Sequence, residues 1–288
     1  MTAAELIAQA AKRLSDAGVP EPELDAKILF LEAFHMDQVH FLMNRMRPLT
    51  EEQRAQQETY EVMIDRRSAR VPLQQILGSQ EFMGLTFRVT PDVLIPRQDT
   101  ETLVEQVLQE QKDPDIRLLD LCTGSGCIAI SLAVLGGYQN VTAVDISEAA
   151  LRVAKKNARR LFLIQKGTAR SESFQVSEDP WCIRLKTWLA KGPRLQAEIE
   201  EHSLTLLQSN LFQAVEADVM YDVIVSNPPY IPSAVIDGLE PEVRDHEPRL
   251  ALDGSEDGLY FYRCNPCRYK PCTVHLSFRI GRTRSGFR

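Results

Sequence analysis

Short apolar runs alternate with helical segments from residue 117 onward, and this order constrains the fold more than any other feature of the sequence. The apolar runs at residues 117–121, 140–144 and 221–226 predict buried strands. Residues 128–135 and 149–161 have the apolar spacing of helices. Strands that alternate with helices form a parallel sheet with both faces covered. We therefore predict an α/β fold built on such a sheet.

The first 80 residues have a different pattern, which predicts a small bundle of helices. Apolar residues recur at helical spacing in three segments, and the first of these ends at Gly18. The second helix is expected to begin near Pro22. The third is expected to begin at Thr50, where Thr50 and Gln53 can form a capping box.

Residues 81–96 alternate like a β-hairpin with Gly84 at its turn, and we place the domain boundary there. The chain is thus expected to have a helical domain at 1–80, a hairpin linker and an α/β domain at 97–263. Residues 164–203 interrupt the α/β pattern and are interpreted as an insertion.

Composition limits the cellular compartments and the classes of partner that we expect for this chain. The net charge of −7 argues against a long nucleic acid as the main partner, because phosphate contacts need a basic surface. No apolar run reaches the roughly 18 residues that cross a bilayer. The first residues lack the pattern of a secretion signal, and the six cysteines do not form a secreted disulfide framework. A monomer in the cytoplasm is expected, with no membrane or direct nucleic-acid partner; the mitochondrial matrix is the alternative compartment.

A strand, a glycine-rich turn and a helix start follow one another at residues 120–128, which read Asp-Leu-Cys-Thr-Gly-Ser-Gly-Cys-Ile. Glycines let backbone approach a ligand, and a helix N-terminus offers free N–H groups. The next strand ends in Asp145, where a carboxylate can bind both hydroxyls of a ribose. Asp120 is unfavourable beside a pyrophosphate but suits a cationic sulfonium with an amino-acid tail. S-adenosylmethionine is therefore the expected ligand, with an NAD-type cofactor or a purely structural turn as alternatives.

Residues 227–230 read Asn-Pro-Pro-Tyr and directly follow a predicted strand. Two consecutive prolines make the loop rigid, and it lies at the carboxyl end of a strand, where open α/β sheets bind ligands. Asn227 can hydrogen-bond a planar amino group, and Tyr230 can stack on it. Such a nitrogen is a poor nucleophile, but hydrogen bonds to its protons and alignment with a methyl group help it to attack. The alternative interpretation is a proline-rich loop that caps a helix.

Together these residues resemble the class I S-adenosylmethionine-dependent methyltransferases that modify planar amino nitrogens. The resemblance is most specific to the release-factor glutamine methyltransferase family, often called HemK or PrmC, and runs from residue 1 to about residue 263. It implies a Rossmann-like class I methyltransferase sheet with a small N-terminal helical bundle. Further positions that carry the resemblance are Pro22-Glu23, Asp25-Ala26, Pro72-Leu73-Gln74, Gly78, Glu81-Phe82, Leu94-Ile95-Pro96-Arg97, Thr100-Glu101, Ile231-Pro232, Glu247-Pro248-Arg249 and Ala251-Leu252-Asp253-Gly254.

The resemblance implies methyl transfer to the side-chain amide nitrogen (N5) of the glutamine in the Gly-Gly-Gln motif of class 1 peptide chain release factors. The N-terminal helices would dock the body of the factor. No metal ion is implied. The implied catalytic residues are Asn227, Pro228 and Tyr230, and the implied substrate-binding residues are these three and Pro229. The implied cofactor-binding residues are Asp120, Cys122, Thr123, Gly124, Ser125, Gly126, Asp145, Asn210, Leu211 and Asn227.

The last 25 residues depart from the family, which continues after Arg263 with further helices and strands that complete the sheet. Here residues 264–288 contain six Lys or Arg and no acid, and they show neither strand nor helix period. We therefore predict that the C-terminal strands are missing or aberrant and that this tail is unstructured. The alternative is a zinc site whose ligands would be Cys264, Cys267, Cys272 and His275. Smaller departures occur at Gln98, Asp99 and Asn210.

Two other functions compete with glutamine methylation. An adenine-N6 or other nucleic-acid amino methyltransferase shares residues 227–230 but would need a basic region that recognises its target. The altered C-terminus suggests instead an inactive truncated remnant that binds only cofactor or release factor.

Overall fold

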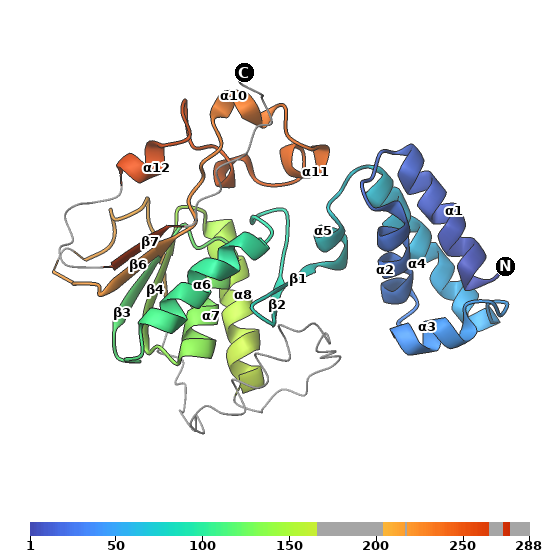
Figure 1. Cartoon of the computed structure of the whole chain (residues 1–288), viewed down its shortest axis with the longest axis horizontal. Helices are drawn as coiled ribbons and strands as arrows, with labels where there is room; N and C mark the ends of the chain where they lie inside the picture. The colour runs from blue at the N-terminus through green and yellow to red at the C-terminus, as the bar shows by residue number, and fades with distance from the viewer. Residues whose placement is uncertain (166–203, 217, 265–272, 277–288) are drawn as a thin grey trace, which may run out of the picture. The chain divides into compact units, whose positions relative to one another are not determined.

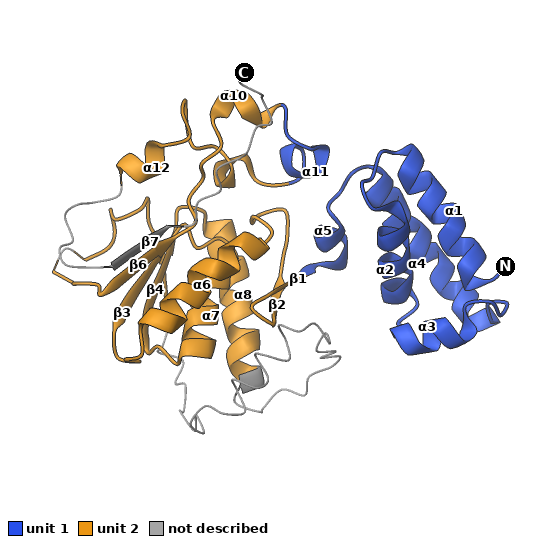
Figure 2. Cartoon of the chain, viewed as in Figure 1, with its two compact units in different colours: residues 1–79, 238–246 blue, residues 80–237, 247–288 orange. Residues whose placement is uncertain are grey.

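The computed structural model describes residues 1–165, 204–216, 218–264 and 273–276, so the predicted insertion at 164–203 lies almost wholly outside it. The chain divides into two compact units (Figure 2). The first contains Met1–Ser79 and Gly238–His246, and the second contains Gln80–Asp237 and Glu247–Arg288. No helix in the described part of the chain is long and apolar enough to span a bilayer.

The first unit is a bundle of helices around an aromatic core. Phe30 and Tyr60 are fully buried, and their rings meet edge to face with centroids 5.6 Å apart. The expected capping box at Thr50 and Gln53 is present, because each side chain binds the other residue's backbone N–H. The helices, labelled in Figure 1, are α1 (Ala3–Asp16), α2 (Pro22–Ala33), α3 (Gln38–Asn44), α4 (Glu51–Ser68), α5 (Leu73–Leu77) and α11 (Pro241–Arg244).

Partly buried ion pairs hold the segment Gly238–His246 in the first unit, an arrangement that the sequence analysis did not predict. The guanidinium of Arg67 donates to Asp25 at 2.7 Å and to Glu242 at 2.9 Å. Arg70 donates to both carboxylate oxygens of Glu242, at 2.6 Å each. This bidentate geometry is among the strongest that side chains form.

The second unit contains a five-stranded sheet in the order β5-β4-β3-β6-β7, in which each pair of neighbouring strands is parallel. The predicted fold class, a helical N-terminal part followed by a parallel α/β methyltransferase sheet, is confirmed. The strands are β3 (Arg117–Leu121), β4 (Asn140–Asp145), β5 (Leu204–Gln208), β6 (Val223–Ser226) and β7 (Thr273–Leu276). The remaining elements are the hairpin β1 (Ser79–Phe82) and β2 (Leu85–Arg88), the helices α6 (Gln98–Glu110), α7 (Cys127–Gly136), α8 (Glu148–Gln165), α10 (Ser233–Ile236) and α12 (Tyr260–Arg263), and the 3₁₀ turn η1 (Arg249–Ala251).

Alternate residues of β3 supply the cores on the two faces of the sheet, as the period of a strand requires. Leu118 belongs to the core that α6 and α7 cover. Leu119 and Leu121 belong to the opposite core, where Val215 and Tyr221 cover them. The chain runs outward from β3 to β5 and then returns to β6 on the other side of β3. Open α/β sheets bind ligands at such a reversal, beside the carboxyl ends of the strands.

The prediction of an unstructured tail without further strands is wrong for residues 273–276. These residues form β7, which pairs in parallel with β6 from Val223 opposite Thr273 to Ser226 opposite Leu276. An uncovered β6 would leave a row of free N–H and C=O groups, and such an edge readily accepts another strand. The other residues of the tail beyond Cys264, with Cys267 and Cys272 of the considered zinc site among them, lie outside the described residues.

Candidate functional site

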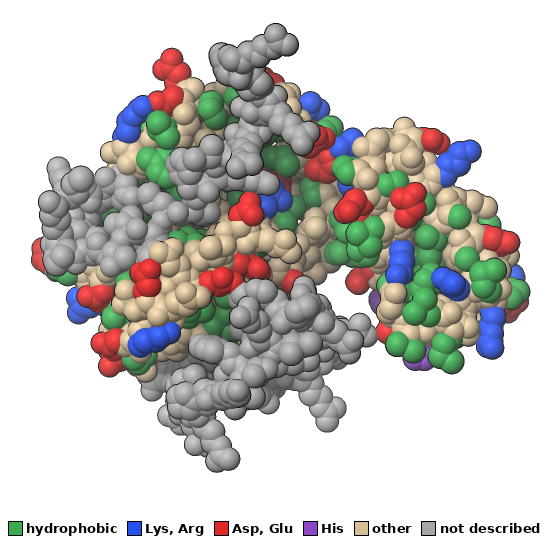
Figure 3. Space-filling view, viewed as in Figure 1, with side chains coloured by type: hydrophobic (Ala, Val, Ile, Leu, Met, Phe, Trp, Pro, Cys, Tyr) green, Lys and Arg blue, Asp and Glu red, His purple; other side chains and the backbone are tan. Residues whose placement is uncertain are grey.

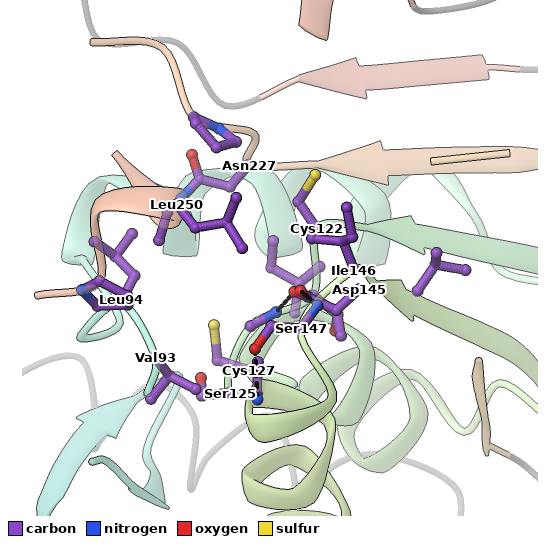
Figure 4. A pocket seen from close by; sticks show the side chains of 18 of the residues that line it. Val93, Leu94, Cys122, Ser125, Cys127, Asp145, Ile146, Ser147, Asn227 and Leu250 are labelled. Atoms are coloured by element: carbon purple, nitrogen blue, oxygen red, sulfur yellow. Dashed lines mark hydrogen bonds between the residues drawn. The ribbon is translucent and has the colours of Figure 1, made fainter. Parts of the chain in front are cut away.

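A pocket of about 280 Å³ lies in the second unit, at the carboxyl ends of β3, β4 and β6 (Figure 4). Figure 4 shows Asn227 and Leu250 on one side of it and Ser125, Cys127 and Val93 on the other. Nine of the residues predicted for the cofactor or the substrate line the pocket: Cys122, Thr123, Gly124, Ser125, Asp145, Asn210, Leu211, Asn227 and Pro229.

The glycine-rich turn adopts backbone conformations that explain its composition. Gly124 and Gly126 have φ angles of 56° and 82°, in the left-handed region that glycine adopts without strain. A Cβ on Gly126 would lie only 2.7 Å from Cδ1 of Ile130. A Cβ on Gly124 would meet nothing within 4 Å. The turn is therefore tightly packed at Gly126 and open at Gly124, where a ligand can approach the backbone.

Asp145, at the end of β4, connects the next strand to this turn. One carboxylate oxygen accepts from the backbone N–H of Gly124 at 2.8 Å, and the other accepts from that of Ser147 at 2.9 Å. Burial raises the pKa of Asp145, although these backbone N–H groups oppose the rise. Each oxygen keeps a lone pair that can accept from a hydroxyl group.

Asp120 does not line the pocket, although the sequence assigned it to the cofactor. Its side chain is fully buried, and Oδ2 accepts from the Thr123 hydroxyl at 2.6 Å and from the Ala129 N–H at 3.2 Å. Oδ1 has no hydrogen-bond partner among the described residues. Burial raises the pKa of Asp120 to about 7. The carboxyl group thus joins the two ends of the turn from within the core.

The loop Asn227–Tyr230 extends from the end of β6, where the Ser226 hydroxyl donates to the carbonyl of Leu121 at 2.9 Å. The side chains of Asn227 and Pro229 line the pocket, whereas Pro228 and Tyr230 do not. Nδ2 of Asn227 donates to the hydroxyl of Thr100 at 3.2 Å. No hydrogen bond from a described residue reaches Oδ1 of Asn227. This oxygen is available to a ligand.

The segment after this loop is fixed by close backbone packing. The N–H of Ile231 donates to the carbonyl of Leu252, and the N–H of Gly254 donates to the carbonyl of Ile231. A Cβ on Gly254 would lie 2.8 Å from the backbone of Tyr230, so no larger residue fits there without movement. The loop is therefore held between β6 and residues 252–254.

Several residues that line the pocket were not assigned to it from the sequence. Arg97 is one of them, and it donates through Nη2 to both carboxylate oxygens of Glu247, at 2.8 and 2.7 Å, although Glu247 itself does not line the pocket. Burial raises the pKa of Glu247, and Arg97 opposes that rise. Arg97, Glu247 and Thr100 were among the positions that carry the resemblance, but no pattern indicated what they contact. Other residues that line the pocket and were not assigned to it from the sequence include Ile146, Ser147, Leu250, Tyr260 and Phe261.

Comparisons with known proteins identify relatives of this chain. The chain matches the family models of the PrmC N-terminal domain over residues 5–78 and of a methyltransferase domain over residues 112–175. The release factor glutamine methyltransferase of Geobacter sulfurreducens is 38% identical over 87% of this chain and 72% of its own length. That of Moorella thermoacetica is 40% identical over 91% of this chain and 78% of its own length. Among solved structures, the ribosomal protein L11 methylase of Lactobacillus delbrueckii subsp. bulgaricus aligns with 57% of this chain and 62% of its own, at 20% identity and a TM-score of 0.30.

Proposed function

The chain belongs to the release factor glutamine methyltransferase family, and from this premise we propose which atoms it acts on. The proposed reaction moves a methyl group from S-adenosylmethionine to the N5 amide nitrogen of the glutamine in the Gly-Gly-Gln motif of class 1 release factors. The observation that carries the proposal is one pocket lined by both the glycine-rich turn and Asn227. It brings a nucleoside site and an amide site together at the point where the sheet reverses.

The residues that line the pocket fit S-adenosylmethionine. The open backbone at Gly124 can lie against the methionine portion, and the oxygens of Asp145 can accept from the ribose hydroxyls. Asn210 and Leu211, which follow β5 and line the pocket, would flank the adenine. Asp120 contributes indirectly, because it binds Thr123 and Ala129 and so holds the turn in shape.

When it is bound, S-adenosylmethionine supplies a methyl group on a positively charged sulfur. The protein's part is to bind and orient the glutamine amide, whose nitrogen lone pair is delocalised into its carbonyl. Oδ1 of Asn227 accepts one hydrogen bond from the –NH₂ group. The carbonyl of Pro228, which the resemblance implies as the second acceptor although Pro228 does not line the pocket, accepts the other. These bonds draw electron density toward the nitrogen and fix its direction of attack. As the new N–C bond formed, the S–CH₃ bond would break with its electron pair staying on the sulfur. The nitrogen would then release a proton to water, so no side chain has to be deprotonated in advance.

The helical unit is proposed to dock the body of the release factor. Its helix α3 presents an apolar face of the kind that binds another protein, with Val39, Leu42 and Met43 more than half exposed. A release factor acts where translation ends, which places the activity in the cytoplasm or, as the alternative, in the mitochondrial matrix.

The first test measures transfer of labelled methyl from S-adenosylmethionine to a purified class 1 release factor. A matched factor in which the Gly-Gly-Gln glutamine is changed to alanine serves as the control. Label on the first factor and none on the second would establish the reaction and the acceptor together. Equal labelling of both would exclude this glutamine as the acceptor. No label on either would favour an inactive chain, provided that S-adenosylmethionine still raises the melting temperature.

A further inference from the structure

Thr100 lies in the first turn of α6, and its side chain contacts the proposed amide site. Only 2% of the residue is exposed, and it lines the pocket. Its backbone N–H donates to the carbonyl of Arg97 at 3.0 Å, which anchors it at the helix start. As a β-branched residue it has few χ1 rotamers. Its hydroxyl is therefore a fixed group at the edge of the pocket.

The hydroxyl of Thr100 accepts from Nδ2 of Asn227 at 3.2 Å, across 127 positions of the sequence. An asparagine amide has a donor end and an acceptor end of nearly the same size and shape. A bond from Nδ2 to Thr100 turns the acceptor end, Oδ1, away from Thr100. Rotation of the amide by 180° would present an –NH₂ group to the ligand in place of the oxygen, while the Thr100 hydroxyl, which can also donate, would bond Oδ1 instead.

We propose that Thr100 is a positioning residue that holds the side chain of Asn227 in place, so that the other end of its amide meets the substrate. The inference rests on the proposed function, because it concerns the same site and the same glutamine. The –NH₂ group of a glutamine has only protons to offer in a hydrogen bond, so it needs Oδ1 of Asn227 and is repelled by Nδ2. With Nδ2 bonded to Thr100, Oδ1 is left to hold the amide nitrogen by its protons, which is the arrangement that makes it nucleophilic.

The kinetic test compares Thr100→Val with Thr100→Ser. Valine keeps the shape and removes the acceptor, so kcat is expected to fall about tenfold, the effect of one lost hydrogen bond. KM for S-adenosylmethionine should stay within about twofold, and serine should restore most of the lost kcat. The matched control is Thr102→Val on the same helix, where the side chain is exposed. Equal losses in Thr100→Val and Thr100→Ser would overturn the inference, since both would then reflect packing.

A double variant tests whether Thr100 acts through Asn227. In an Asn227→Ala background, Thr100→Val should lower the residual rate by less than about twofold. A further tenfold loss there would mean that Thr100 works by a separate route, and would count against the inference.

A spectroscopic measurement separates this inference from the proposed function. The side-chain amide resonances of Asn227 are assigned by their loss in Asn227→Asp and are then compared in wild type, Thr100→Val and Thr102→Val. We expect Thr100→Val alone to shift the pair. If the amide resonances of Asn227 do not shift in Thr100→Val, the inference is overturned, whether or not the protein methylates a release factor. A shifted pair in a protein that labels no release factor upholds the bond between the two side chains and rejects the proposed function.

Discussion

Asp120 and Asp145 stand at the ends of neighbouring strands, and their surroundings give the two carboxyl groups different tasks. Asp145 lines the pocket and accepts two backbone N–H bonds, which stabilise its negative charge. Asp120 lies in the core, where an oxygen without a partner and the lack of water favour the protonated form. Asp145 is available to accept hydrogen bonds from a ligand, whereas Asp120 maintains the shape of the glycine-rich turn.

Asp120→Asn should change how stability depends on pH. The pKa of Asp120 rises from its ordinary value of 3.8 to about 7 in the folded chain. The folded state therefore holds a proton that the unfolded state has lost between these values, and the wild type loses stability as pH rises through that range. Asparagine removes this loss. Relative to wild type, the variant should gain about 2 to 3 kcal/mol between pH 5 and pH 7 in urea unfolding.

The exposed Asp218 supplies the control, since Asp218→Asn should track wild type at each pH. A gap between Asp120→Asn and wild type that stays constant with pH would mean that Asp120 is already charged at pH 5, in conflict with its burial.

Asn227→Ala should abolish transfer and leave cofactor binding nearly unchanged. The variant removes the only side-chain amide of the Asn-Pro-Pro-Tyr loop, so kcat should fall at least about a hundredfold. Affinity for S-adenosylmethionine, measured by calorimetry, should change less than about threefold, because the glycine-rich turn and Asp145 are untouched. Loss of both transfer and cofactor binding would count against a substrate role for Asn227.

At the scale of elements, α3 differs from its neighbours because its apolar face is exposed. Leu42 and Met43 follow Val39 by three and four residues, Met46 follows them by four and three just beyond the helix, and all four are 52–73% exposed. Figure 3 shows hydrophobic side chains gathered over this part of the helical unit. Phe41 points the other way, into the core. Such a face on a short helix is typical of a surface that binds another protein.

The double variant Met43→Ser/Met46→Ser should therefore weaken recognition of a whole release factor. KM for the factor should rise about tenfold, as expected when interface anchors are lost. Transfer to a short Gly-Gly-Gln peptide should be unaffected, since a peptide has no body to dock. Val62→Ser on α4, which removes an exposed apolar side chain elsewhere, is the matched control. Equal effects on factor and peptide would show that the face does not bind the factor.

On the scale of the whole molecule, the chain passes between the two units at residues 79–80, 237–238 and 246–247. The last two crossings flank a segment that Arg67 and Arg70 hold through Glu242. Burial opposes the charge on Glu242, but its bonds from the two arginines outweigh this and lower its pKa. The ion pairs thus fix part of the catalytic half of the sequence within the helical unit.

Glu242→Ala should destabilise the helical unit by about 2 to 3 kcal/mol, because two guanidinium groups lose their shared partner. Glu240→Ala tests the same segment at a side chain that is 76% exposed, and should cost less than about 0.5 kcal/mol. Because the pKa of Glu242 is lowered in the folded chain, the stability that its ion pairs contribute is present above the ordinary pKa of 4.5 and is lost as the pH falls further. The gap between wild type and Glu242→Ala in urea unfolding should accordingly narrow below pH 4.5; equal costs for the two variants would refute the role of the ion pairs.

The sequence by itself determined the kind and order of most elements, because the side chains that a helix or strand buries on one face recur along the sequence at the period of that element. It predicted β3 at its observed bounds, the capping box at Thr50 and the turn at Gly84. It missed α3, whose apolar face is not buried. It also missed β7, which forms by pairing with the edge of β6. The motif residues 120–128 and 227–230 also pointed to the family before any contact was known.

Only the tertiary structure decided which residues meet. Asp120 follows the pattern of a ligand-binding residue, yet packing places it beneath the turn. Thr100 and Asn227 come together across 127 residues, and the segment Gly238–His246 joins helices from the other end of the chain. The physical reason is that a local pattern records whether a side chain is buried. It does not record its partner, which depends on how distant elements pack.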